Sequence, residues 1–300
     1  MIGSVKHRDT PESAILRTLL YASVFHAGIL IQDLECLLIT PQSFSRRQIQ
    51  TSLTALVQRK TIFQKDSWIW MGKEVSYTAL KRKYAESAKK KKRLFSLLPL
   101  ISWIPTIQGI AITGSVAVGN ANPSEDIDLM IITSTGFLWT TRVLVEGILF
   151  VCRVLRTRGM KNVRNKLCLN LWLEEGSLLL PTHSLYVARE LIQADWVICR
   201  DQIREHMLAH NTWIRAFLHG SSYKKHPRDY RVSQVWYVSL CSVLLEPLAF
   251  FVQTSYMRSK TREIVTKQAA FFHPRDTQGS VLKKYADVCR RSQIDSLVRE

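Results

Sequence analysis

Apolar residues recur along this chain at several spacings, and each spacing predicts a different kind of element. Between residues 11 and 58 they return every three or four positions in three segments, which is typical of amphipathic helices. Two short apolar runs separated by a polar turn follow and predict a β-hairpin. The predicted helices cover Pro11 to Phe25, Leu30 to Leu38 and Ser43 or Ser45 to Gln58, and the hairpin strands cover Thr61–Phe63 and Trp68–Trp70.

Three helices followed by a two-stranded wing resemble a winged helix, and we expect a winged-helix-like domain over residues 1–76. On and after its third helix, Arg46, Arg47, Arg59 and Lys60 could face a nucleic-acid backbone. The helix presents no clear array of base-reading side chains, however. Winged helices also serve as protein-docking modules, and both alternatives stay open.

Residues 77–97 combine helical spacing with the densest charge in the chain. Eight Lys or Arg residues stand there against the single Glu86, a local balance of +7. We predict a basic linker helix between two domains. Its cations are either an ordinary solvated face or a means of steering an anionic substrate or nucleic acid.

Apolar runs rich in β-branched residues predict the strands of a sheet. The predicted strands are Ile110–Thr113, Leu129–Ile132 and Leu167–Leu173. A longer apolar stretch, Phe137 to Leu155, predicts a helix packed on that sheet. Because Arg142, Glu146 and Arg153 interrupt the stretch, a membrane span is not expected there.

From His183 onward the pattern becomes helical, and we expect a helical C-terminal domain over residues 183–300. The most hydrophobic run of the chain, residues 232–257, carries Glu246 and Pro247 in its middle. A buried helix kinked at the proline is the favoured interpretation. Association of this run and the basic helix with a membrane surface is the alternative, although a membrane partner is not the main expectation.

The composition adds a strong positive charge to this picture. The 300 residues include 42 Lys and Arg against 24 Asp and Glu, which gives a formal net charge of +18. Such a balance favours polyanionic partners: nucleic acid, anionic membrane or nucleotide phosphates. The hydrophobic content of 46% is enough for two or three packed units.

Cysteine usage and the first residues favour a cytoplasmic protein. The six cysteines are scattered, lie mostly in apolar runs and have no metal-ligand spacing, so we expect reduced core thiols rather than disulfides or structural zinc. The first thirteen residues contain no apolar signal-peptide core, so secretion is not expected.

The segment from residue 109 to residue 133 carries the candidate chemistry. A predicted strand ends at Gly114 and Ser115, where glycine permits a sharp turn and serine offers a hydroxyl to a phosphate. Asp126 and Asp128 stand two apart at the start of the next predicted strand. Residues i and i+2 of an extended chain point to the same face, so the two carboxylates predict a site for a hard cation such as Mg²⁺. No Lys or Arg lies between Gly114 and Ile132, which makes this segment an acidic island in a basic chain.

The order Gly114-Ser115, Ala117, Gly119 and then Asp126-Ile127-Asp128-Leu129 resembles the signature of the DNA polymerase beta-type nucleotidyltransferase superfamily, in particular its minimal enzymes and antitoxins. The resemblance extends to roughly residues 95–200. It implies an α+β fold with a nucleotidyltransferase-type mixed sheet, over residues 98–182. It also implies a nucleoside triphosphate as substrate, with Gly114 and Ser115 holding its β- and γ-phosphates. Asp126 and Asp128 would then hold Mg²⁺ or Mn²⁺ and pass a nucleotidyl group to an unidentified hydroxyl acceptor.

Members of this superfamily usually add a third carboxylate from a neighbouring strand. In this chain the middle of that strand carries Asn170, which cannot act as a base, while Glu174 or Glu175 at its end could substitute. We therefore expect Glu174 as the third catalytic residue. The alternative is a non-catalytic DNA-binding regulator or antitoxin-like protein that retains a degenerate transferase fold.

Overall fold

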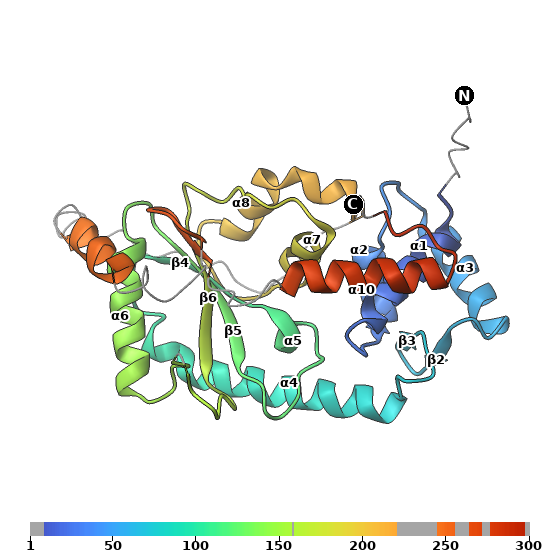
Figure 1. Ribbon diagram of the computed structural model, residues 1–300, viewed down its shortest axis with the longest axis horizontal. Helices are drawn as coiled ribbons and strands as arrows, with labels where there is room; N and C mark the ends of the chain where they lie inside the picture. Colours follow the sequence, from blue (N-terminus) through green and yellow to red (C-terminus); the bar gives the residue numbers. More distant parts are fainter. Residues whose placement is uncertain (1–8, 158, 221–244, 256–263, 272–276, 298–300) are drawn as a thin grey trace.

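The computed structural model describes residues 9–157, 159–220, 245–255, 264–271 and 277–297. The N-terminal helices lie at one end of the molecule and a mixed sheet at the other, and a long helix runs beneath both (Figure 1). The described part is therefore a mixed α+β structure, as the sequence predicts.

The N-terminal end contains the predicted helices and hairpin, together with a short additional strand. Its elements are α1 (Pro11–Ser23), β1 (Ile29–Leu30), α2 (Ile31–Leu37), α3 (Arg46–Gln58), β2 (Phe63–Lys65) and β3 (Trp68–Trp70). The strands form an antiparallel sheet in the order β1-β3-β2. Helix α3 starts at Ser45, whose hydroxyl accepts a hydrogen bond from the backbone N–H of Gln48, and this local cap explains why its start was predictable.

The predicted basic linker is one continuous helix, α4 (Tyr77–Leu97), capped by the Ser76 side chain and followed by a short 3₁₀ turn, η1 (Leu98–Leu100). It runs along the underside of the molecule from the N-terminal hairpin to the sheet (Figure 1). One helix therefore contacts both ends of the described structure.

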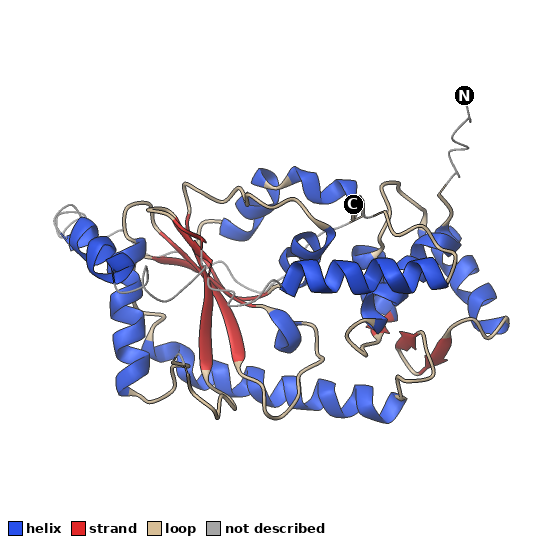
Figure 2. Cartoon of the chain, viewed as in Figure 1, coloured by secondary structure: helices blue, strands red, loops and turns tan. Residues whose placement is uncertain are grey.

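The larger sheet has six described strands in the order β7-β4-β5-β6-β9-β8 (Figure 2). They are β4 (Ile107–Ile112), β5 (Ile127–Thr133), β6 (Leu167–Glu174), β7 (Asp195–Cys199), β8 (Ile264–Val265) and β9 (Ala269–Phe271). Strands β5 and β6 are parallel, whereas β4 pairs antiparallel with both β5 and β7. The expectation that the chain is helical beyond His183 is thus incomplete, because β7, β8 and β9 join the sheet.

Helices lie on both faces of this sheet. The remaining helices are α5 (Gly114–Ala117), α6 (Leu138–Val151), α7 (Leu185–Gln193), α8 (Ile203–His210), η2 (Thr212–Ala216) and α10 (Thr277–Arg291), of which α10 packs on α1 and α7. On one face, Ile110 and Ile131 belong to a core with Trp139 of α6. On the other, Met130 and Ile132 belong to a core that also contains buried residues of α1, α3, α7 and α10. The N-terminal helices therefore share a core with the sheet.

Residues 245–255 form a further helix that differs from expectation. It is not buried, because Leu245, Leu248, Phe251 and Val252 are all more than half exposed. Pro247 lies among the described helical residues, and the residues before 245 that would define the start of this helix lie outside the described part. The rest of the hydrophobic run before residue 245 lies outside the described residues. Among those described, no helix is both long enough and apolar enough to cross a membrane.

Candidate functional site

The turn between β4 and α5 brings Gly114 directly against Asp128. Gly114 has a φ of +63°, in the left-handed region that favours glycine. A Cβ atom placed on it would lie 2.9 Å from a carboxylate oxygen of Asp128. The Thr113 N–H also donates to the Asp128 carbonyl at 2.9 Å. The pairing of β4 with β5 therefore brings the Gly114 turn next to Asp128, although the two are separated in sequence.

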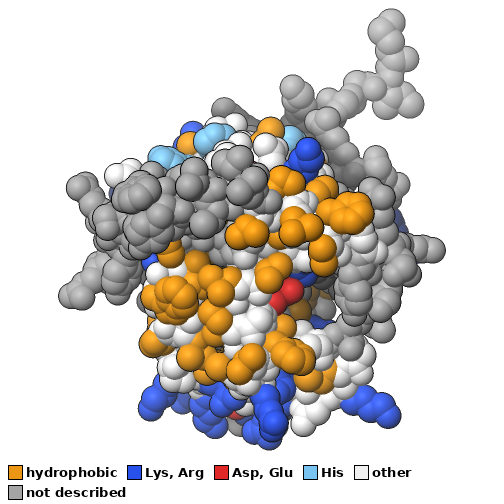
Figure 3. All heavy atoms as spheres, turned by 90° about the vertical axis from the view of Figure 1, so that its left-hand side faces the viewer, with side chains coloured by type: hydrophobic (Ala, Val, Ile, Leu, Met, Phe, Trp, Pro, Cys, Tyr) orange, Lys and Arg blue, Asp and Glu red, His pale blue; other side chains and the backbone are white. Residues whose placement is uncertain are grey.

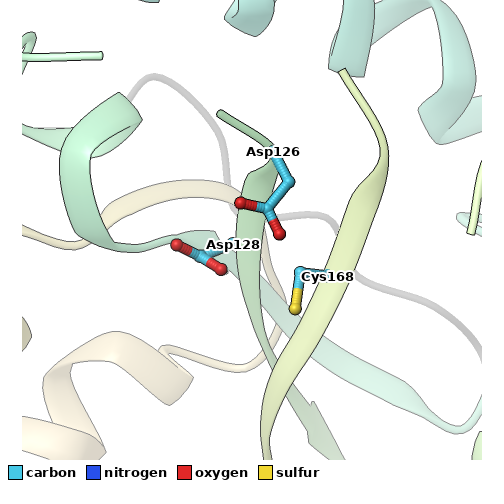
Figure 4. Close-up of side chains that lie close together, drawn as sticks. All are labelled: Asp126, Asp128 and Cys168. Carbon is cyan, nitrogen blue, oxygen red and sulfur yellow. The ribbon is translucent and has the colours of Figure 1, made fainter. Parts of the chain in front are cut away.

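Asp126 and Asp128 point into the same space, as their spacing predicts (Figure 4). Asp126 immediately precedes β5 and Asp128 is its second residue. Cys168 lies opposite Asp128 on the parallel strand β6, and its sulfur completes a group of possible metal-ligand atoms that all lie within 4.8 Å of one another. The position across from the aspartates is thus a thiol.

Both aspartates contact polar side chains of the protein. The Asn170 amide donates to Asp128 at 2.5 Å, and the Arg156 guanidinium forms an ion pair with Asp126 at 2.5 Å. The Cys168 thiol donates to the Asn170 side-chain oxygen at 2.9 Å. Asn170 therefore lies in the site, as an amide that orients a carboxylate rather than as a base.

The site is electrostatically unfavourable for its own carboxylates. Burial, followed by the charges of Asp126 and Glu190, raises the pKa of Asp128 to about 7. Burial and the same two aspartates raise the pKa of the Cys168 thiol to about 12, so it is protonated at neutral pH. A bound cation would relieve both effects, because it lowers the free energy of the ionised groups.

Glu190 of α7 is a site residue that the sequence pattern did not indicate. Its carboxylate accepts a hydrogen bond from the Gly114 N–H at 3.3 Å, and burial raises its pKa. On the chain it is an ordinary acidic position of an amphipathic helix. Only the packing of α7 against the sheet reveals that it faces the aspartates.

Ser115 is engaged in the same way as Gly114. Its hydroxyl donates to Glu125 at 2.7 Å, and the same carboxylate accepts from the Asn122 backbone N–H at 2.9 Å. Both groups that were expected to hold phosphate, the Gly114 turn and the Ser115 hydroxyl, therefore contact glutamate side chains.

A cavity of about 480 Å³ opens beside these residues and extends toward the N-terminal helices. Its lining includes Gly114, Ser115, Asp126, Asp128 and Glu190 at one end. Aromatic side chains from other elements form much of the rest: Tyr21, Phe25, Trp68, Tyr84, Tyr186 and Trp196. The cavity thus combines a polar, acidic end with an aromatic one, which is typical of sites for small organic ligands.

Part of the basic helix α4 supports the loop that carries the acidic residues. Lys90 is only 1% exposed, and its ammonium donates to the Glu125 carbonyl at 2.6 Å, to the Pro123 carbonyl at 3.3 Å and to Asn165 at 3.0 Å. Lys83, on the same side of the helix, donates to Asn120 at 3.1 Å. These two lysines are therefore neither a solvated face nor free to steer a ligand.

Glu174, the expected third carboxylate, lies at the opposite end of β6. It pairs with Thr133, whereas Cys168 pairs with Asp128, so six residues or about 20 Å of strand separate it from the aspartates. It is 4% exposed and accepts from the Gly136 N–H at 3.0 Å. The expectation that Glu174 completes the site is wrong, because the strand register carries it away.

Comparison with protein-family models, with curated proteins and with solved structures finds no match for this chain.

Proposed function

We propose that this protein binds a nucleoside triphosphate with a divalent metal ion and transfers its nucleotidyl group to a hydroxyl acceptor. The observation that carries the proposal is the shared cavity: the Gly114–Ser115 turn and the Asp126–Asp128 pair line it together. A turn and a carboxylate pair that face one space are what the proposed transfer requires, and this arrangement supports the proposal.

The residues present fit a hard divalent cation. Asp126 and Asp128 offer carboxylate oxygens on one face of β5, and six acidic residues line the cavity against two basic ones, Lys91 and Arg189. An unaccompanied polyphosphate would meet net repulsion there. Mg²⁺ or Mn²⁺ held by the two aspartates would neutralise charge on the phosphates and on the departing pyrophosphate. The Gly114 N–H and the Ser115 hydroxyl would turn from their glutamate partners to phosphate oxygens.

Glu190 is the group best placed to act as general base in this proposal. It reaches the acidic end of the cavity from α7, and burial raises the pKa of its carboxyl group, which makes the ionised form a stronger base. The acceptor oxygen would form a bond to the α-phosphorus, the bond between that phosphorus and the bridging oxygen would break, and pyrophosphate would leave. The acceptor proton would pass to the Glu190 carboxylate.

The label used in the assay decides the reaction class. The full chain is incubated with Mg²⁺ and each nucleoside triphosphate, labelled at either the α- or the γ-phosphate, in the presence of protein, RNA and small hydroxyl compounds. Transfer of the α-label without the γ-label supports the proposal, whereas transfer of the γ-label alone indicates a phosphotransferase and contradicts it. Absence of binding by every metal–nucleotide complex also contradicts it.

Two glutamate substitutions distinguish a residue of the proposed site from a residue outside it. Glu190→Gln should keep metal–nucleotide binding and lower transfer by about 10²-fold or more, because only the base is removed. Glu174→Gln should leave the transfer rate within about twofold, since its carboxylate lies at the far end of β6. Equal losses in both variants would argue against a base at Glu190.

A non-catalytic binder is the second candidate, and one observation favours it. Strand β6 presents Cys168 and Asn170 to the aspartates instead of a carboxylate, and Arg156 already pairs with Asp126. This candidate predicts thermal stabilisation by the metal–nucleotide complex, or salt-sensitive binding of duplex DNA, with no label transferred to any acceptor.

A further inference from the structure

Large apolar side chains are exposed mainly on two helices, α6 and the helix of residues 245–255. Eight of them, between 42% and 79% exposed, form what we term the apolar face: Val143, Leu144, Phe150, Val151, Leu245, Leu248, Phe251 and Val252. Five other large apolar side chains of the described residues are classed as exposed, and they are scattered over four other segments. Figure 3 looks onto this end of the molecule and shows apolar side chains over much of it.

Hydrogen bonds and a ring contact hold the two helices against each other, so the apolar face has a defined geometry. The Glu246 carboxylate accepts from the backbone N–H groups of Trp139 and Thr140 at 2.6 and 2.8 Å, which satisfies the first turn of α6. Gln253 donates to the Trp139 carbonyl at 3.0 Å. The Trp139 and Phe250 rings meet edge to face, 5.2 Å apart. These polar and ring contacts hold the two helices together, and the eight residues of the apolar face point outward.

The charges on these helices are compensated within the pair. Arg142 and Glu146 of α6 form an ion pair at 2.8 Å, and burial raises the pKa of Glu146. Residues 245–255 contain one ionisable side chain, Glu246, which is bound to the start of α6. The apolar face therefore carries no uncompensated charge that entry into an apolar phase would have to desolvate.

Cations gather along one edge of the apolar face. Among the described residues between 152 and 166, five are basic and none is acidic: Arg153, Arg156, Lys161, Arg164 and Lys166. Phe150 and Val151 line a hollow of about 400 Å³ together with Arg153, Met160 and Lys166. Figure 3 shows Lys and Arg side chains along the lower edge of this end. We call the exposed members of this loop the basic edge.

We propose that this end of the protein binds the surface of an anionic lipid bilayer. An apolar helical face beside a basic edge matches the acyl boundary and the negative headgroups, which lie at adjacent depths of one leaflet. A nucleic acid would pair with the basic edge and leave the apolar face in water. A second copy would bring a like-charged basic edge and another +18 of net charge.

Co-sedimentation of the full chain with vesicles tests the proposal. We expect binding to phosphatidylcholine vesicles that contain phosphatidylserine, weaker binding without phosphatidylserine, and partial release by high salt. Phe150→Glu combined with Phe251→Glu should lower the partition coefficient at least about tenfold, because two exposed rings are replaced by anions. Phe63→Glu combined with Leu179→Glu is the matched control: these side chains are 38% and 56% exposed but lie on neither helix, and binding should be unchanged.

Charge reversal tests the basic edge separately. Lys161→Glu with Arg164→Glu should weaken binding by more than about tenfold, since each cation near the surface contributes about fivefold. The matched control is Lys81→Glu with Arg82→Glu, at the other end of α4 (Figure 1), which changes the net charge equally and should have little effect.

Four outcomes would overturn the proposal. The first is that the wild-type chain does not sediment with any vesicle. The second is that both charge-reversal pairs weaken binding equally, which indicates diffuse electrostatics. The third is a dimer, detected by light scattering without vesicles, that dissociates when Phe150 and Phe251 are replaced. The fourth is nucleic-acid binding that depends on Lys161 and Arg164 in a chain that ignores vesicles. Melting temperatures of all variants establish that they are folded.

Discussion

At the residue scale, Gly114 is fixed by two independent constraints. Its φ of +63° disfavours a side chain, and any Cβ would lie 2.9 Å from an Asp128 carboxylate oxygen. The first constraint is a property of the turn alone. The second links the turn to the aspartate pair, so a substitution there must disturb both.

Gly114→Ala is therefore expected to lower the free energy of unfolding by about 2 kcal/mol or more, and to weaken Mg²⁺ binding. Gly136→Ala is the matched control, because Gly136 has a φ of +79° but a Cβ there would meet no atom within 4 Å. It should cost about 1 kcal/mol and leave metal binding unchanged. Denaturant titration and metal-dependent thermal shifts measure both quantities; equal effects would show that contact with Asp128 is unimportant.

Asp128 makes stability depend on pH. Its pKa of about 7 in the folded protein exceeds the ordinary value of 3.8, so the folded state binds more protons between these values. Stability of the metal-free protein should thus fall as pH rises from about 4 to 7, by a few kcal/mol. The raised pKa of Glu190 acts in the same direction. Nearby Asp126 and Arg156 act on Asp128 with opposite signs.

Asp128→Asn should flatten this dependence and stabilise the metal-free protein more at pH 8 than at pH 5. Mg²⁺ should show the same pH dependence in the wild type and stabilise it more at pH 8, where the carboxylate is ionised and need not lose a proton to bind the ion. Asp287→Asn, at a partly exposed acid of α10 that pairs with Arg290, is the control. Denaturant unfolding in chelator measures the profile, and an unchanged slope in Asp128→Asn would contradict the assignment.

At the element scale, α4 shows that neighbouring lysines of one basic run can lie in different environments. Lys89 and Lys90 are neighbours in one basic run, yet Lys89 is exposed and Lys90 is 1% exposed against the loop before Asp126. Helical geometry turns adjacent residues about 100° apart, so one run contains both a solvated and a buried position. Which lysine faces inward depended on the partner of the helix.

Lys90→Met should lower the free energy of unfolding by about 2–4 kcal/mol, because the carbonyl groups of Pro123 and Glu125 lose a buried charged donor. It should also weaken metal binding at Asp126, which follows this loop directly. Lys89→Met, whose side chain makes a single exposed contact with Glu86 at 3.8 Å, should change stability by less than about 0.5 kcal/mol. Thermal unfolding with and without Mg²⁺ would compare the pair, and similar values for both would contradict a supporting role of Lys90.

The same contrast explains how much of the site could be predicted. Asp126 and Asp128 share a face because of strand geometry within three residues, and the glycine turn is equally local. Cys168 and Glu190 enter through the register of β6 on β5 and through the packing of α7, which no local pattern encodes. Glu174 was expected because it ends β6, the strand beside the aspartates. The pairing register places it at the end of β6 that lies away from them.

At the scale of the whole molecule, one core joins the N-terminal helices to the sheet. It contains Leu53 of α3, Met130 of β5, Leu191 of α7 and Tyr285 of α10. The cavity is bounded by β5 and α7 of this core, together with α1, α2 and α4. The sequence predicted these elements well where caps and spacing are local, whereas their assembly around one core depends on contacts between distant segments.

The shared core predicts that the N-terminal helices and the sheet unfold together. Far-UV circular dichroism and tryptophan fluorescence should give coincident transitions. Leu53→Ala, at a site 2% exposed in α3, should shift both by the same amount, with a loss of about 2–5 kcal/mol. Two separated transitions, with only the first moved by Leu53→Ala, would show that the units are energetically independent.

Gly114 and Ser115 donate hydrogen bonds to glutamate side chains, and this would affect the order in which a metal ion and a nucleotide bind under the proposed function. The Gly114 N–H and the Ser115 hydroxyl each already donate to a glutamate carboxyl group, so a phosphate could accept from either donor only after that bond breaks. Under the proposed function, a nucleotide that arrives without a metal ion would have to displace both carboxyl groups and would add more negative charge to the pocket. A nucleotide already bound to Mg²⁺ would instead bring positive charge to these carboxyl groups, and the pocket would therefore bind the metal–nucleotide complex in preference to the free nucleotide.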